Sequence, residues 1–232
     1  MFLVWLLFIL LTVFSPIERS ALHAQWDALL RRYVKVDGRV NYKGLATNRA
    51  KLKAYLRVLS QHPPTADWSR AEKMAYWINA YNAWTIDLVL EHYPIRSIME
   101  LDGGKTWQVK RIEIGGERYS LNDIENRILR PEFGDARIHF VINCAARSCP
   151  PLYNRAYTAD NVELLLEERT RQFISDSRFN RITASRADIS KIFDWYATDF
   201  GDVRSFLARY SGVDLLPTAT IHFLEYDWSL NE

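Results

Sequence analysis

Residues 69–94 read SRAEKMAYWINAYNAWTIDLVLEHYP and predict the most clearly delimited helix of the chain. Ser69 and Glu72 are spaced as a capping box, in which the serine oxygen accepts a hydrogen bond from the Glu72 amide and the glutamate reaches back to the first amide. Apolar residues then recur at intervals of three and four positions until Pro94, which cannot continue a helix. We therefore expect a helix over residues 70–92.

The rest of the chain contains more helical patterns than strand patterns. Apolar spacing, caps and Gly or Pro terminators predict helices at 25–35, at 52–59 before Pro63, at 121–130 after a second capping box at Ser120, at 159–175 with Thr158 as cap, at 190–199 and at 202–210. Strand patterns occur in a hairpin around Gly115-Gly116, at 137–143 and at 220–228. Because strands and helices do not alternate regularly, the pattern predicts an α+β fold, a helix-rich single domain packed around a small sheet.

The composition is that of a balanced globular chain. Its 232 residues are 48% hydrophobic and 25% charged, and 30 Lys and Arg against 28 Asp and Glu leave a net charge of +2. This balance lacks the strong positive field of a nucleic-acid-binding domain, so we expect no nucleic-acid partner. No Pro-, Gly- or Ser-rich linker divides residues 25–232, which we expect to form one globular domain.

Residues 2–14, FLVWLLFILLTVF, form an uncharged apolar run. The run is shorter than the roughly 20 residues that a membrane-spanning helix needs, and it is typical of the hydrophobic region of a signal peptide. We expect residues 1–24 to be a signal peptide cleaved after Ala24, or else residues 2–17 to be a membrane anchor. Both alternatives predict an exported protein in a periplasmic or other extracytoplasmic location, which contacts the membrane only through this segment if it is not cleaved.

The stretch HFVINCAARSCPP at 139–151 gathers both cysteines with a histidine, an arginine and a serine. Three interpretations are open for Cys144 and Cys149. They form a disulfide, which an oxidising environment favours; they are two buried thiols; or Cys144 is a nucleophile with His139 as its base. A strand at 137–143 would turn His139 and Cys144 to opposite faces, which counts against the last pairing.

Other chemistry has less support in the sequence. His222, followed by Asp227, is a more distant candidate base for Cys144. His139 and the two cysteines have poor spacing for a zinc site, so we expect no metal. The chain contains no H-E-x-x-H, P-loop, G-x-S-x-G or G-x-G-x-x-G motif, and we expect no cofactor.

Asn79 and Asn82 lie three positions apart on one face of the predicted central helix. Asparagine is unfavourable inside a helix, so two of them indicate partners for their amides. These partners are backbone groups near the loop after Asn143 or, alternatively, a ligand. Core packing best explains the tryptophans, although Trp107 and Trp228 are candidates for an exposed carbohydrate-binding surface.

Four longer stretches resemble one known family. WINAYNAWTIDLVL at 77–90, SLNDIENRILR at 120–130, RIHFVINCAARSCPPL at 137–152 and YDWSLN at 226–231 follow the order of the family called domain of unknown function 547. The resemblance covers about residues 33–231 and looks like the bacterial, exported form in which the domain stands alone, without the coiled-coil segment of plant relatives. It implies a shared fold and no established activity.

The resemblance also implies that its polar motif positions converge on one pocket. These positions are Asn79, Tyr81, Asn82, Glu125, His139, Cys144, Ser148, Cys149 and Pro150. With the neighbouring Arg147 they give a candidate catalytic pair, Cys144 and His139, and a candidate ligand-binding set, Asn79, Tyr81, Asn82, Glu125, Arg147 and Ser148.

Two functions are compatible with these residues. The first is a thiol-dependent hydrolase or transferase centred on Cys144. The second is a non-catalytic ligand-binding or scaffold module with a structural Cys144–Cys149 disulfide. In either case we expect the partner to be a ligand or protein of the cell envelope.

Overall fold

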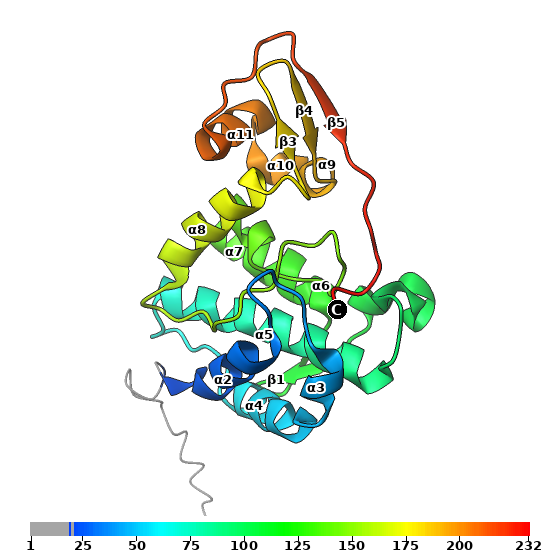
Figure 1. Cartoon of the computed structure of the whole chain (residues 1–232). Helices are drawn as coiled ribbons and strands as arrows, with labels where there is room; N and C mark the ends of the chain where they lie inside the picture. Colours follow the sequence, from blue (N-terminus) through cyan, green and yellow to red (C-terminus); the bar gives the residue numbers. More distant parts are fainter. Residues whose placement is uncertain (1–18, 20) are drawn as a thin grey trace, which may run out of the picture.

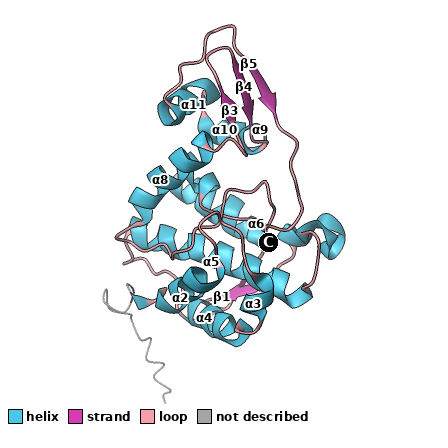
Figure 2. Ribbon diagram, viewed as in Figure 1, coloured by secondary structure: helices cyan, strands magenta, loops and turns pink. Residues whose placement is uncertain are grey.

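The computed structural model describes Arg19 and residues 21–232 and consists mainly of helices (Figure 1, Figure 2). Short strands form two separate small sheets. The predicted helix-rich α+β fold is confirmed. The expected membrane anchor at residues 2–17 lies outside the described residues, as does the expected signal peptide apart from Arg19 and residues 21–24. Among the residues described, no helix is both long enough and apolar enough to span a membrane.

The first and larger part of the described chain builds a helical body. Its elements are α2 (Ala24–Tyr33), α3 (Tyr42–Ala46), α4 (Arg49–Gln61), α5 (Arg70–His92), the 3-10 helices η1 (Ile98–Gly104) and η2 (Thr106–Gln108), the hairpin strands β1 (Ile112–Ile114) and β2 (Glu117–Tyr119), α6 (Leu121–Asp123), the π-helix η3 (Ile124–Leu129), α7 (Arg130–Phe133), the 3-10 helix η4 (Ala136–Phe140) and α8 (Val162–Ser175). A smaller unit follows α8 and contains β3 (Arg181–Ile182), β4 (Arg186–Ile189), α9 (Ile192–Trp195), α10 (Ala197–Phe200), α11 (Val203–Ser211) and β5 (Thr220–Phe223).

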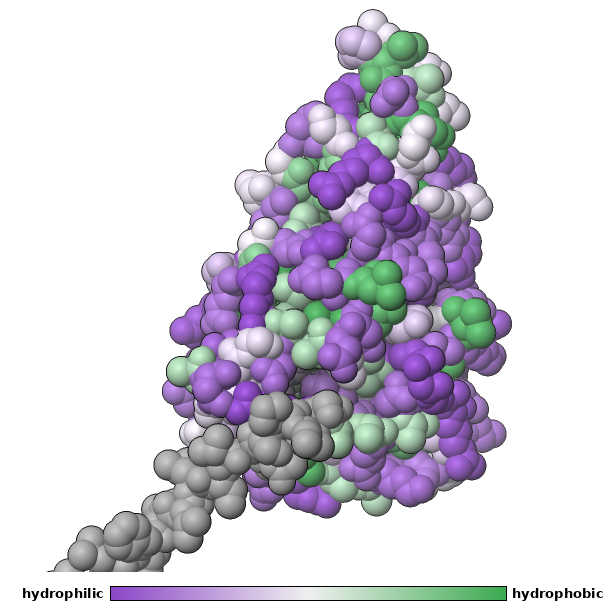
Figure 3. Space-filling model, turned by 90° about the vertical axis from the view of Figure 1, so that its left-hand side faces the viewer, coloured by the Kyte–Doolittle hydropathy of each residue, from purple (hydrophilic) through white to green (hydrophobic). Residues whose placement is uncertain are grey.

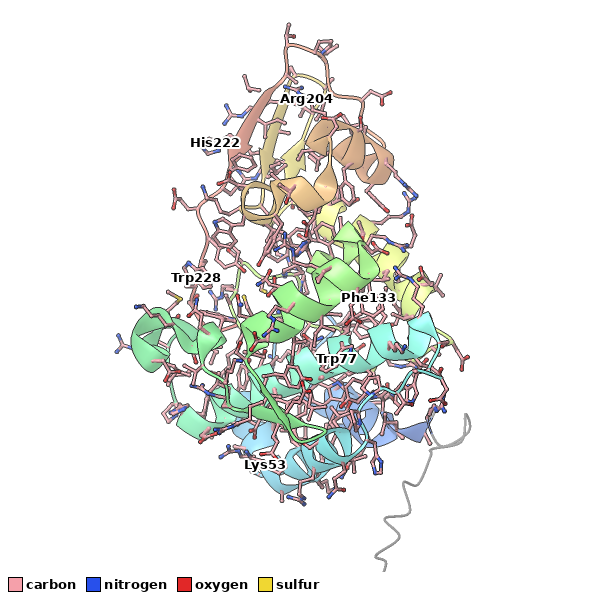
Figure 4. All side chains as sticks on the ribbon, turned by 180° about the vertical axis from the view of Figure 1, so that it is seen from behind. Lys53, Trp77, Phe133, Arg204, His222 and Trp228 are labelled. Carbon is pink, nitrogen blue, oxygen red and sulfur yellow. The ribbon has the colours of Figure 1, made fainter. Side chains whose placement is uncertain are left out.

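Helix α5 is the central helix of the body, and Figure 4 marks Trp77 on it. All of its residues from Met74 to Leu90 are buried except Trp84, which is half-buried. The predicted capping box is present, since Ser69 Oγ accepts from the Glu72 amide at 3.2 Å and Glu72 Oε2 accepts from the Ser69 amide at 2.7 Å. A helix that is buried all round is a core helix, and α3, α4, α6, η3 and α8 all pack on this one.

The smaller unit has a second hydrophobic core. Strand β3 pairs with β4 antiparallel, and β4 pairs with β5 parallel. After β5 the chain runs back to the body (Figure 1), where the amides of Arg147 and Ser148 donate to Ser229 O and Asp227 O. This returning segment, residues 224–231, is called the tail below. The tail therefore connects the smaller unit to the body.

The surface in Figure 3 is mostly hydrophilic, with hydrophobic residues in small separate groups. Exposed large hydrophobic residues of the described chain, such as Val36 and Leu164, lie on separate elements. The apolar side chains of the described residues therefore lie mainly in the two cores.

The strand predicted at 137–143 is wrong, because residues 136–140 form the 3-10 helix η4. Asp135 begins this helix by accepting a hydrogen bond from the Arg137 amide at 2.9 Å. Every residue from 138 to 143 is buried, so the alternation of apolar and polar residues does not separate an inner face from an outer one. The apolar pattern arises from burial on all sides and not from a sheet.

The helix predicted at 159–175 begins three residues later, at Val162. Thr158 does not cap it, and the Thr158 amide instead donates to Asn161 Oδ1 at 2.8 Å. The strand predicted at 220–228 ends at Phe223. The Leu224 amide still donates to Ile189 O of β4, and beyond it the tail bonds to the cysteine loop.

Other elements lie close to their predicted positions. The Gly115-Gly116 hairpin is confirmed, with Ile114 opposite Glu117. The helices predicted at 25–35, before Pro63 and at 202–210 correspond to α2, α4 and α11. The helix predicted at 121–130 is present as α6, η3 and α7, and the one predicted at 190–199 is interrupted at Tyr196 between α9 and α10.

Two buried asparagines of α5 bind the backbone of two other segments. Asn82 Nδ2 donates to Val141 O at 2.9 Å, and the Asn143 amide donates to Asn82 Oδ1 at 2.8 Å. Asn79 bonds in the same two-ended way to the carbonyl and amide of Tyr157, at 2.7 and 3.1 Å. Each side chain thus replaces the pair of backbone bonds that a neighbouring strand would supply. Backbone binding is therefore the role in which the structure shows these two amides.

We expect Asn82→Ala to lower the free energy of unfolding by about 2–5 kcal/mol, because the Val141 carbonyl and the Asn143 amide would both lose a partner while buried. Urea unfolding followed by circular dichroism measures the change. Asn154→Ala, at a half-buried asparagine outside this contact, is the control and should stay within about 0.5 kcal/mol of the wild type. Equal stability of the two variants would contradict the role assigned to Asn82.

Candidate functional site

A cavity of about 300 Å³ lies where the body, α9 and the tail meet. Helix α5, the π-helix η3, the loop after η4 and the tail all contribute side chains to its wall. Six of the nine motif positions expected to converge lie here together: Tyr81, Glu125, His139, Cys144, Cys149 and Pro150.

The loop at 143–150, called the cysteine loop below, is fixed by hydrogen bonds around Asn143. The Oδ1 atom of Asn143 accepts from the Ala145 amide at 2.8 Å and from Asn231 Nδ2 at 3.0 Å. The Asn231 amide donates in turn to Ala145 O at 3.0 Å. Ala145 has a positive φ of 66°, which costs a non-glycine residue about 1–3 kcal/mol and is common at functional sites. The surroundings therefore impose a strained backbone directly after Cys144.

The two thiols are in contact. Cys144 Sγ lies 2.8 Å from Cys149 Sγ, and the Cys144 amide donates to Cys149 Sγ at 2.9 Å. The distance between the sulfurs exceeds the roughly 2.05 Å of a disulfide bond, and both cysteines are free here. The disulfide therefore stays a prediction. Cys144 is half-buried and Cys149 is buried, so Cys144 is the more accessible thiol.

The surroundings favour a negative charge on Cys144 and oppose one on Cys149. The pKa of Cys144 is lowered mainly by its hydrogen bond with Cys149, and further by the Tyr226 hydroxyl and the Ala146 amide, against the effect of burial. Tyr226 Oη lies 3.3 Å from Cys144 Sγ. Burial raises the pKa of Cys149 well above its usual value. The pair is thus polarised into one thiol that ionises readily and one that keeps its proton.

Glu125 adds a buried carboxyl to the same cavity. Burial raises its pKa, although hydrogen bonds from the Tyr196 and Tyr81 hydroxyls oppose the rise. Burial also raises the pKa of both tyrosines, which therefore keep their protons. A carboxyl with a raised pKa can give and take a proton beside a thiolate.

His139 lines the cavity but bonds to Asp199. Its Nε2 lies 2.8 Å from Asp199 Oδ2, and its ring stacks on Tyr196 with the ring centres 3.9 Å apart. Arg130 binds Asp199 through two bonds of 2.6 and 2.7 Å and holds the pKa of that carboxyl well below its usual range. Burial lowers the pKa of His139 to about 4. Within the described residues, no hydrogen bond joins His139 to either thiol, so the candidate catalytic pair shares a cavity without forming a diad.

Other candidate residues lie elsewhere. Arg147 and Ser148 line a neighbouring cavity, and Asn79 and Asn82 bind backbone. His222 is exposed on β5 with its Nδ1 3.5 Å from an Asp188 oxygen, and Figure 4 shows it on the smaller unit, apart from Trp228 on the tail. In the part of the chain that the structure describes, no group of three or more His, Cys, Asp or Glu side chains is arranged to hold a metal ion.

An aromatic wall lies along the cavity, and the sequence identifies only two of its four residues. It consists of Trp107, Trp195, Tyr226 and Trp228, whose neighbouring ring centres are 4.6–5.8 Å apart. Trp107 and Trp228 are half-buried and Trp195 is 45% exposed. The only sequence signal for Tyr226 is its place in the stretch YDWSLN. No sequence pattern identifies Trp195, because its contacts with Tyr226 and Trp228 of the tail depend on the path of the chain after β5.

Residues 65–174 match the family model described as "Protein of unknown function, DUF547". The match covers a little under half of the chain. The matched residues include α5 and the cysteine loop and supply Tyr81, Glu125, His139 and both cysteines to the cavity, whereas Trp195 and Tyr226 come from beyond them. Comparison with curated proteins and with solved structures gave no match.

We expect His139 to lower the free energy of unfolding as the pH is lowered from about 6.5 to about 4, because it is buried with a pKa of about 4. In this window the unfolded chain binds a proton at this histidine and the native protein does not, so the His139 contribution favours unfolding on acidification, while the raised pKa of Glu125 acts in the opposite direction. Carboxylates with a lowered pKa, such as Asp199, lose their contribution only at lower pH.

Urea unfolding at a series of pH values measures this slope. His139→Gln, which keeps a hydrogen-bonding group near Asp199, should remove the His139 contribution and make the loss of stability on acidification smaller than in the wild type. An unchanged slope in this variant would show that His139 is not buried in its uncharged form.

Proposed function

We propose that this protein is a thiol-dependent hydrolase or transferase in which Cys144 is the nucleophile. The observation that carries the proposal is the thiol pair on the cavity, in which Cys144 Sγ lies 2.8 Å from Cys149 Sγ and 3.3 Å from Tyr226 Oη. The thiolate is the reactive form of cysteine, and the lowered pKa of Cys144 increases its population at neutral pH.

Acyl transfer is the reaction that suits these groups best. Cys144 Sγ attacks the carbonyl carbon of an ester, thioester or amide and forms a thioester, while the alcohol, thiol or amine leaves. Glu125 gives its proton to the leaving group and regains one when water or another acceptor attacks the thioester. His139 is a positioning residue in this scheme, because it packs on Tyr196, whose hydroxyl bonds to Glu125.

The aromatic wall supports a second candidate, a ligand-binding module without catalysis. Trp195 is partly exposed at the cavity and can stack on a flat apolar face of a ligand, such as the face of a sugar ring. No Lys or Arg is among the residues that line the cavity, which suits an uncharged ligand. In this candidate Cys144 and Cys149 form a structural disulfide, and ligand binding does not need a Cys144 thiolate.

We expect p-nitrophenyl acetate, a small uncharged ester, to acetylate Cys144 in the native protein. Mass spectrometry of the acid-quenched protein, followed by peptide mapping, locates the acetyl group. Cys144→Ser should abolish this modification. Glu125→Gln should slow turnover by about 10²-fold, because it removes the proton donor and acceptor.

Leu164→Ala, at an exposed position on α8 remote from the cavity, is the matched control and should react like the wild type. Native Cys144 should also react with iodoacetamide at least about tenfold faster at neutral pH than the same residue in the urea-unfolded chain. Acetylation that persists in Cys144→Ser, or a native Cys144 no more reactive than in the unfolded chain, would favour the binding module instead.

We propose in addition that the protein is exported to the cell envelope, on the basis of the apolar run at residues 2–14. Intact mass and fractionation of producing cells test this. A mature chain that begins at Gln25 outside the cytoplasm is the expected result, and a chain that keeps Met1 in the membrane fraction identifies an anchor. A chain with residues 1–24 intact in the cytoplasm would contradict export.

A further inference from the structure

The acyl-transfer scheme uses the Cys144 thiol and gives no chemical task to the second one. Yet Cys149 Sγ is the nearest polar atom recorded for Cys144 Sγ, at 2.8 Å, closer than Tyr226 Oη at 3.3 Å. Closing a disulfide requires the two sulfurs to approach by less than about 1 Å, to the bond length of roughly 2.05 Å. The cysteine loop therefore already holds the two atoms in position to react with each other.

The pair is reached from the cavity through Cys144. Cys144 is half-buried and lies on a cavity of about 300 Å³, whereas Cys149 is buried with 6% of its surface exposed. A small oxidant that enters the cavity therefore meets Cys144 first. The lining has no Lys or Arg and includes the aromatic wall, so an uncharged molecule with an apolar group fits it better than an anion.

We propose that the Cys144–Cys149 pair reduces a small organic hydroperoxide and is converted into a disulfide in the process. The proposal rests on the proposed function in one respect, since both use Cys144 as the nucleophile. It adds a redox reaction to the same site and makes Cys149 the resolving thiol.

The reaction balances with the groups in the cavity. The Cys144 thiolate attacks the terminal oxygen of the hydroperoxide, the O–O bond breaks, and Cys144 becomes a sulfenic acid. The alkoxide that leaves takes a proton from the Glu125 carboxyl and departs as an alcohol. The sulfur of Cys149 then attacks the sulfur of the sulfenic acid, and the Cys149 proton leaves with the hydroxyl group as water. The two thiols are oxidised by two electrons, the hydroperoxide is reduced, and two molecules of an external thiol restore the pair.

The surroundings of the two sulfurs suit both steps. Tyr226 Oη lies beside Cys144 Sγ and can stabilise the thiolate before the attack. The Cys144 amide, which donates to Cys149 Sγ at 2.9 Å, keeps the second sulfur next to the first. Burial keeps Cys149 protonated and thereby protects it from direct oxidation, so the order of events is set by the environment of each thiol.

The test uses the protein with both thiols reduced and then freed of reductant. One equivalent of cumene hydroperoxide is added, and the intact mass is measured with and without alkylation after denaturation. We expect the mass of the wild type to fall by that of two hydrogen atoms, both thiols to become unreactive towards alkylation, and dithiothreitol to reverse the change. Cys149→Ser should instead accumulate a sulfenic acid on Cys144 that dimedone traps, and Cys144→Ser should stay reduced.

The outcomes separate this inference from the proposed function. One outcome is that native Cys144 reacts rapidly with p-nitrophenyl acetate while cumene hydroperoxide oxidises the pair no faster than it oxidises the unfolded chain. That result excludes the redox activity and leaves the proposal that Cys144 is a nucleophile intact. If Cys144 is unreactive to both reagents, both proposals fail together. Oxidation by glutathione disulfide but not by the hydroperoxide would also overturn the inference. Cys149→Ser replaces a buried side chain. If that variant does not fold, the mass change of the wild type alone tests the inference.

Discussion

The two-ended hydrogen bonds between Asn82 and the backbone of residues 141–143 fix the cysteine loop to the central helix. Asn143, whose amide donates to Asn82, bonds through its own side chain to Asn231 of the tail. Asn231 Oδ1 in turn accepts from the Tyr42 hydroxyl at 2.8 Å. A chain of buried amides thus joins α5, the cysteine loop, the tail and α3. Because an unpaired buried amide is costly, these segments hold one another in a single arrangement.

Burial has opposite consequences for the ionisable groups of the cavity. It lowers the pKa of His139 and raises the pKa of Glu125, so it favours the uncharged form of both the base and the acid. The two cysteines are chemically identical in the sequence, yet their surroundings separate them: hydrogen bonding lowers the pKa of Cys144, and burial raises the pKa of Cys149. The chemistry of the site therefore comes from packing and hydrogen bonding around ordinary side chains.

Local patterns in the sequence are sufficient to predict most of the helices and part of the site. The capping box at Ser69 and the apolar spacing after it identify α5, and the unfavourable asparagines on that helix indicate that their amides have partners. Asn82 binds the backbone near residue 143, whereas Asn79 binds that of Tyr157. The strand predicted at 137–143 fails because its alternation reflects complete burial, which periodicity cannot distinguish from a sheet. This error removes the argument that His139 and Cys144 point to opposite faces, although the structure still does not join them.

The remaining parts of the site depend on contacts between segments far apart in the chain. Trp195 and Tyr226 reach the cavity only because β5 directs the tail back to the body, and no local pattern specifies that path. The sulfur of Cys149 lies beside that of Cys144 because Asn143 and Asn231 shape the intervening loop. Glu125 is found from the resemblance alone, since a single glutamate on a helix has no distinguishing signal. Local sequence determines the helices, whereas tertiary hydrogen bonds determine the chemistry.

The central claim is that the fold gives its two cysteines different acidities. Titration of the ultraviolet absorbance of the thiolates over a range of pH, in the native protein and with tyrosine ionisation followed separately, tests it most directly. The account predicts two separated steps, the first below the usual thiol value of 9.0 and the second well above it. The first step should disappear in Cys144→Ser. A single transition at or above the usual value for both thiols would contradict the account, because Cys144 would then have no environment that favours its thiolate.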